Sequence, residues 1–80
     1  MRAVSKQDEL YEASGQGIEA VRALAQPWDA AQRERVGHAV RVRIVDEMNA
    51  ATRATSELQI EVAPWLWRLD TLRRAGLSPA

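Results

Sequence analysis

Apolar residues recur with a helical period through the second half of the chain. At about 100° per residue they fall within one arc of roughly 120°. The positions are Val36, Val40, Ile44, Met48, Ala51, Thr55, Leu58 and Val62. This pattern predicts one long amphipathic helix over residues 29–62. The same phase continues through Trp65, Leu66, Leu69 and Leu72.

Shorter helices are predicted on either side of the long one. Ser5 is placed to cap a first helix over residues 5–25, in which Gly15 and Gly17 are weak points. We expect that helix to be continuous and closely packed; an interruption at the glycines is the alternative. Pro64 should kink the long helix or begin a third one over residues 64–75, with Gly76 as the residue that ends it.

These elements predict an all-α fold in one domain, residues 1–80. It would be a helical hairpin or small bundle built on the long helix. The alternative is an α+β fold, because residues 40–45 and 58–62 alternate in polarity and are rich in β-branched side chains. We favour the helix, since a single phase accounts for both segments and for the residues between them.

Composition excludes several classes of function. The chain has no cysteine, one histidine and a formal net charge of zero. We therefore predict no metal, no cofactor, no small-molecule substrate and no enzymatic activity. Without an apolar stretch of about 20 residues or an export signal, we expect no membrane span and a cytoplasmic location. Ten arginines among eleven basic residues, with fourteen alanines, favour a bacterial or phage origin.

The length of the main helix predicts self-association. A helix over residues 29–62 would be about 50 Å long, whereas the first helix would cover only about 30 Å of it. Residues 28–45 carry a net charge of +2 and residues 46–63 a net charge of −3. We therefore predict an antiparallel homodimer. Its interface would comprise Val36, Val40, Ile44, Met48, Ala51, Leu58, Val62, Arg33, Arg43, Glu47 and Glu57.

Two further sets of residues are candidates for binding. Trp67 falls on a second face with Ala31, Val42 and Ile60, which is expected to receive the first helix; as an alternative, Trp67 anchors another protein. Trp28 is expected to pack at the turn between helices and is a weaker partner-binding candidate. A net charge of zero disfavours nucleic acid as a partner, but an arginine cluster leaves nucleic-acid binding as an alternative. The cluster comprises Arg33, Arg35, Arg41 and Arg43.

The sequence thus favours a small helical protein-interaction module, an accessory, regulatory or inhibitory factor of a bacterium or phage. The alternative is a dimeric nucleic-acid-binding protein that uses the arginine cluster. A small enzyme with its site between chains is less favoured, because the arginines are predicted to lie on the surface.

Overall fold

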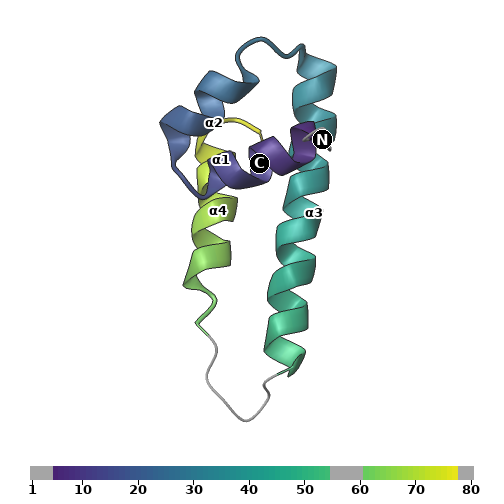
Figure 1. Ribbon diagram of the computed structural model, residues 1–80, viewed down its shortest axis with the longest axis vertical. Helices are drawn as coiled ribbons and strands as arrows, with labels where there is room; N and C mark the ends of the chain where they lie inside the picture. The colour runs from purple at the N-terminus through teal and green to yellow at the C-terminus, as the bar shows by residue number, and fades with distance from the viewer. Residues whose placement is uncertain (1–4, 55–60, 78–80) are drawn as a thin grey trace, which may run out of the picture.

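The computed structural model describes residues 5–54 and 61–77, which form an antiparallel helical hairpin crossed by two short helices (Figure 1). The helices are α1 (Lys6–Ser14), α2 (Ile18–Ala25), α3 (Ala30–Ala54) and α4 (Ala63–Arg74). The predicted all-α fold is confirmed. Residues 40–45 lie inside α3 and no strand occurs in the described ranges, so the α+β alternative is wrong.

The first predicted helix is two helices rather than one. Ser5 caps α1 as expected, its Oγ accepting a hydrogen bond from the Asp8 amide at 3.1 Å. The helix ends at Ser14, and Gly17 precedes α2 with φ 132° and ψ 176°. That backbone region is open almost only to glycine. The prediction of a continuous helix was therefore wrong, because the chain turns at Gly17 and α2 contacts both α1 and α4.

The long helix is also shorter than predicted. Helix α3 runs to Ala54, and Glu61 and Val62 are not helical. The predicted residues Thr55, Leu58 and Ile60 lie outside the described residues. Pro64 stands in the first turn of α4, where its missing N–H costs nothing. It marks the start of a new helix rather than a kink in the old one.

The C-terminal end of α4 closes with the predicted glycine. Gly76 has φ 80°, its amide donates to the Arg73 carbonyl at 3.0 Å, and the Leu77 amide donates to the Leu72 carbonyl at 2.9 Å. This pair of bonds is a Schellman motif. It folds Leu77 back so that its side chain is buried and its carbonyl lies over Gly37 of α3.

The hydrophobic core lies in the upper half of the hairpin, where α1 crosses from α3 toward α4 (Figure 1). Its fully buried apolar side chains come from all four helices. They are Leu10, Val21, Val40, Ile44 and Leu72. Trp28, Val36 and Leu77 are nearly as buried.

Candidate protein-interaction surface

The apolar stripe predicted as a dimer interface is largely occupied within the chain itself. Val36, Val40 and Ile44 are buried in the core. Met48, Ala51 and Val62 are half-buried, and Leu58 lies outside the described residues. The prediction that this stripe is buried by a second chain was wrong for its first half, because α1, α2 and the end of α4 cover it.

The charged residues assigned to that interface also have partners in the same chain. Arg33 donates to the carbonyls of Ala25 at 3.1 Å and Gln26 at 3.0 Å, at the C-terminal end of α2. Arg43 lies 3.6 Å from Glu47 and 3.0 Å from Asp8. Glu57 lies outside the described residues. Arg43 and Glu47 therefore fix α1 on α3 within one molecule.

A cluster centred on Tyr11 ties α1 to both arms of the hairpin. The Tyr11 hydroxyl donates to Glu47 Oε1 at 2.7 Å. The guanidinium carbons of Arg43 and Arg68 lie 3.9 and 4.6 Å from the centre of its ring. These are cation–π distances. The pKa of Asp8 is lowered by its hydrogen bonds to Ser5 and then to Arg43. Arg43 pairs with Asp8 and Glu47, whereas Arg68 forms no ion pair with any described residue and its Nε is buried without a hydrogen-bond partner.

Tyr11 gives this cluster a signature at high pH. Burial, followed by the hydrogen bond to Glu47, raises the pKa of Tyr11 above 10.0. A raised pKa means that the folded state holds the proton more tightly. The stability from this bond is therefore complete below pH 10 and is lost as pH rises through the folded-state pKa.

We expect the tyrosinate absorbance of the folded protein to develop at higher pH than that of the unfolded chain. Tyr11 is the only tyrosine, so the signal reports this residue alone. In Glu47→Gln the midpoint should shift down toward the ordinary value, because the carboxylate no longer opposes ionisation. An unshifted midpoint in the native protein would show that the Tyr11–Glu47 bond is not formed in solution.

The arginine cluster does not form a surface suited to a phosphate backbone. Arg33 and Arg43 are held by the contacts given above and are half-buried, whereas Arg35 and Arg41 are exposed. They lie about 120° apart on α3, since six residues separate them at about 100° each. Two divergent cations are too few for a continuous phosphate track. The arrangement therefore gives no support to nucleic-acid binding.

The three tryptophans have different surroundings. Trp28 is buried at the turn before α3, as expected, which removes it as a partner-binding residue. Trp65 is half-buried against the core. Trp67 is 49% exposed, and the face it was predicted to share with Val42 does not receive α1. That prediction was wrong because α1 packs on the opposite side of α3, against Val40 and Ile44.

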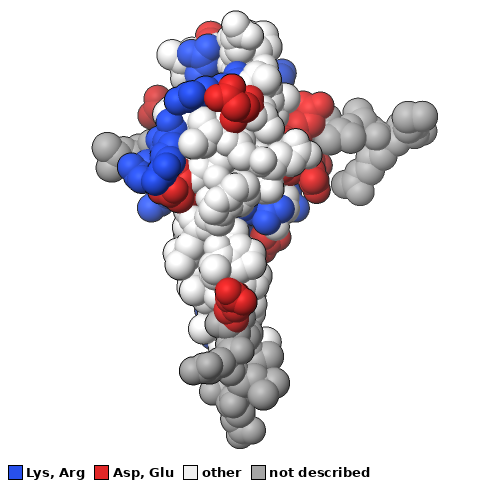
Figure 2. Space-filling view, turned by 90° about the vertical axis from the view of Figure 1, so that its left-hand side faces the viewer, with Lys and Arg blue, Asp and Glu red and all other residues white. Residues whose placement is uncertain are grey.

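Leu66 and Trp67 together make the outer side of α4 apolar. Each is 49% exposed, and they are adjacent on the face opposite buried Leu72. Figure 2 views the molecule from the α4 side, where a largely uncharged surface runs below the charged groups. Leu66 was assigned to the main stripe because the helical phase was carried through residues 55–62. The start of a new helix at Pro64 was the signal that this phase need not hold.

Charge is segregated along this outer face of α4. Glu61 is exposed just before the helix, and Arg73 and Arg74 are exposed in its last turn. Asp70 accepts from Arg73 at 2.7 Å and lies 2.9 Å from Arg74. The hydrogen bond from Arg73 lowers the pKa of Asp70. One carboxylate against two guanidiniums leaves the C-terminal end positive, whereas the N-terminal end is negative.

Searches for other kinds of site gave negative results. Within residues 5–54 and 61–77, no three His, Cys, Asp or Glu residues are grouped as metal ligands. No helix in this part of the chain is long and apolar enough to cross a membrane. Comparison with known proteins found no matching family model, no matching curated protein and no matching solved structure.

Proposed function

We propose that this chain is a small helical protein-interaction module that pairs with a second copy through the outer face of α4. The observation that carries the proposal is the exposure of adjacent Leu66 and Trp67, each of which is 49% exposed among the described residues. Large exposed apolar side chains on a charged small domain favour contact with another protein. The α4 face thus replaces the α3 stripe as the self-association surface.

Charge complementarity supports pairing between copies. If two α4 helices meet antiparallel with their centres near Trp67, residue 73 of one lies opposite residue 61 of the other, six positions away on each side. Arg73 then lies at the end where the partner's α4 begins, near the partner's Glu61, at both ends of the contact. A two-fold pair is self-complementary in this way, whereas parallel helices would oppose like charges.

The area of contact between the two α4 helices determines how strong the dimer is expected to be. One pair of short helices buries less than the roughly 800 Å² per partner of a standard stable interface. We therefore expect a weak dimer with a dissociation constant in the micromolar range. Such a pair forms and separates with concentration, as suits an accessory or regulatory factor.

Mass measured against concentration tests the proposal. By light scattering or sedimentation, the protein should pass from 8.9 kDa toward twice that mass as its concentration rises. Trp67→Ser should weaken association about 30-fold, as expected for loss of about 2 kcal/mol at an interface centre.

Val42→Ser is the matched control. Val42 is 41% exposed on the outer side of α3, away from α4, so its replacement should leave association unchanged. An equal effect of both substitutions would point to non-specific hydrophobic contact. A protein that stays monomeric at millimolar concentration would rule the proposal out.

A further inference from the structure

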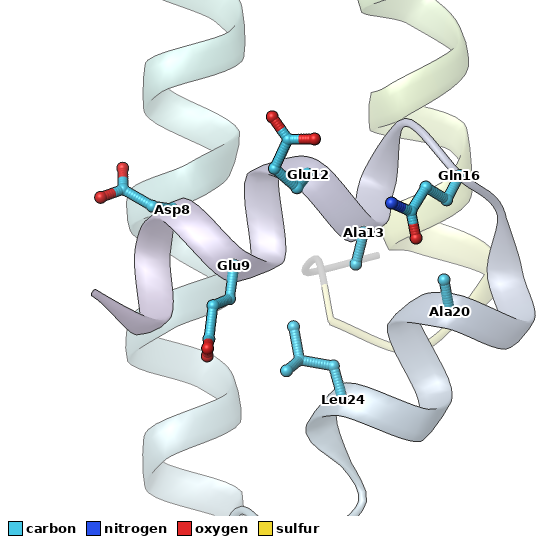
Figure 3. Close-up of a pocket in the computed structure, with 7 residues that line it drawn as sticks. All are labelled: Asp8, Glu9, Glu12, Ala13, Gln16, Ala20 and Leu24. Carbon is cyan, nitrogen blue, oxygen red and sulfur yellow. The ribbon is translucent and has the colours of Figure 1, made fainter. Parts of the chain in front are cut away.

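A second surface of the molecule is hollowed, and it lies away from the exposed face of α4. Helices α1 and α2 diverge from the turn at Gly17 and leave a groove of about 470 Å³ between them (Figure 3). The residues that line it are Asp8, Glu9, Glu12, Ala13, Gln16, Ala20 and Leu24. Five of these belong to α1 or the residues just after it, and two to α2.

The floor of the groove is apolar and built mostly from small side chains. Ala13 is buried, and Ala20 and Leu24 are half-buried against the core. Figure 3 shows Ala13, Ala20 and Leu24 facing the space between the two helices. Because two of the three are alanines, space is left for an aliphatic side chain from outside. Burial of a leucine there would remove apolar surface from water and so favour binding.

The rim of the groove is acidic, and most of its charge is available. Asp8 is held by Arg43 at 3.0 Å. Glu9 and Glu12 are exposed, and neither forms an ion pair with any residue that the structure describes. They are three positions apart on α1, which places their side chains about one turn apart on neighbouring parts of its surface.

We propose that this groove binds a basic amphipathic helix of another protein. A helix laid along two others presents aliphatic and charged side chains at three- and four-residue spacing. A leucine or alanine at its centre would enter over Ala13 and Ala20. Lysine or arginine on the side of that residue nearer the N-terminal end of α1 would lie near Glu9 and Glu12. The negative rim disfavours acidic helices.

The site is separate from the α4 face, so the two proposals fail independently. Trp67→Ser removes self-association without touching α1 or α2, and it provides a monomeric background for the binding measurement. A capped synthetic peptide of alanine, leucine and lysine serves as the probe. Its leucines lie on one helical face and lysines flank them.

Two variants and a matched control test the groove by calorimetric titration with this peptide. The double variant Glu9→Gln with Glu12→Gln should weaken binding at least about tenfold, since it removes two charge pairs at exposed positions. Ala20→Leu should weaken it to a similar degree by filling the floor. Glu34→Gln, an exposed carboxylate on α3, should leave it unchanged.

Amide chemical shifts locate the peptide directly. The largest changes should occur at Ala13, Ala20 and Leu24. A peptide with serine in place of leucine should bind at least about tenfold more weakly, because burial on the floor supplies part of the affinity. Equal binding of both peptides, or equal loss in Glu34→Gln, would overturn the proposal in favour of general charge attraction. Shifts confined to α3 and α4 would overturn it as well.

Discussion

Gly37→Ala is expected to destabilise the protein by about 3 kcal/mol, although alanine normally favours a helix by about 1 kcal/mol over glycine. A Cβ at this position would overlap the Leu77 carbonyl oxygen and lie 3.1 Å from its carbonyl carbon. The obstruction is the backbone of Leu77, whose amide is held by the Schellman motif at the end of α4, so the chain must shift to make room. The substitution must push Leu77 out of the core, where it is 5% exposed. Urea denaturation followed by circular dichroism gives the free energy of unfolding.

A double-mutant cycle separates this cause from a general defect in α3. Leu77→Ala should cost about 2 kcal/mol in the native background but much less beside Gly37→Ala, because Leu77 is already displaced there. Gly15→Ala is a comparison without a backbone obstruction, since the nearest atoms to its Cβ belong to the Arg68 guanidinium, which would have to shift over the Tyr11 ring. If Gly37→Ala raises stability, the approach of Leu77 to α3 is incorrect.

Leu72→Ala is expected to lower stability by about 2–5 kcal/mol, the range for removing a fully buried leucine. The Leu72 side chain is 0% exposed and packs α4 into the core cluster that includes Ile44 and Leu10. An 80-residue domain has about 5–15 kcal/mol in total, so the variant would be partly unfolded at modest temperature. Thermal unfolding by circular dichroism measures the loss.

Leu66→Ala is the matched control on the same helix. Its side chain is 49% exposed on the opposite face, so its removal should change the stability of the monomer by less than about 0.5 kcal/mol. The comparison should be made at a concentration where the protein is monomeric. Equal losses for both leucines would show that the orientation of α4 is wrong.

The parts of the fold that follow local rules were predictable from the sequence. Ser5 caps α1, Pro64 lies in the first turn of α4, and Gly76 ends that helix with positive φ. Each of these features depends on residues within one or two turns. The helical period of α3 also favoured a helix over strands at residues 40–45, and the structure confirms the helix.

The parts that depend on distant contacts were not predictable. The apolar stripe shows that Val36, Val40 and Ile44 must be buried against other side chains. It does not show whether those side chains belong to the same chain or to a second one. The break at Gly17 turns the one helix predicted before residue 26 into two, α1 and α2, and both contribute to this cover. Glu47 stood out as a charge at the edge of the stripe, whereas its partner Tyr11 lies 36 residues away and has no local signature.

The exposed face of α4 was predictable only in part. Trp67 was recognised as lying off the main stripe, which is the property that leaves it exposed. Leu66 was misplaced because one helical phase was applied across two helices. A phase counted from Pro64 alone, with Leu72 and Trp65 inside, places Leu66 and Trp67 on the outer side.

The most direct test of pairing through α4 is a charge-swap measurement in the centrifuge. Glu61→Arg and Arg73→Glu are each made separately, with Arg74 left to hold Asp70. In an antiparallel pair, either variant alone opposes like charges, whereas a mixture sets arginine against glutamate at both ends. If α4 pairs in this way, we expect each variant alone to be monomeric at a concentration where the native protein is half dimeric, and the equimolar mixture to recover the dimer. A mixture no heavier than its components would contradict it.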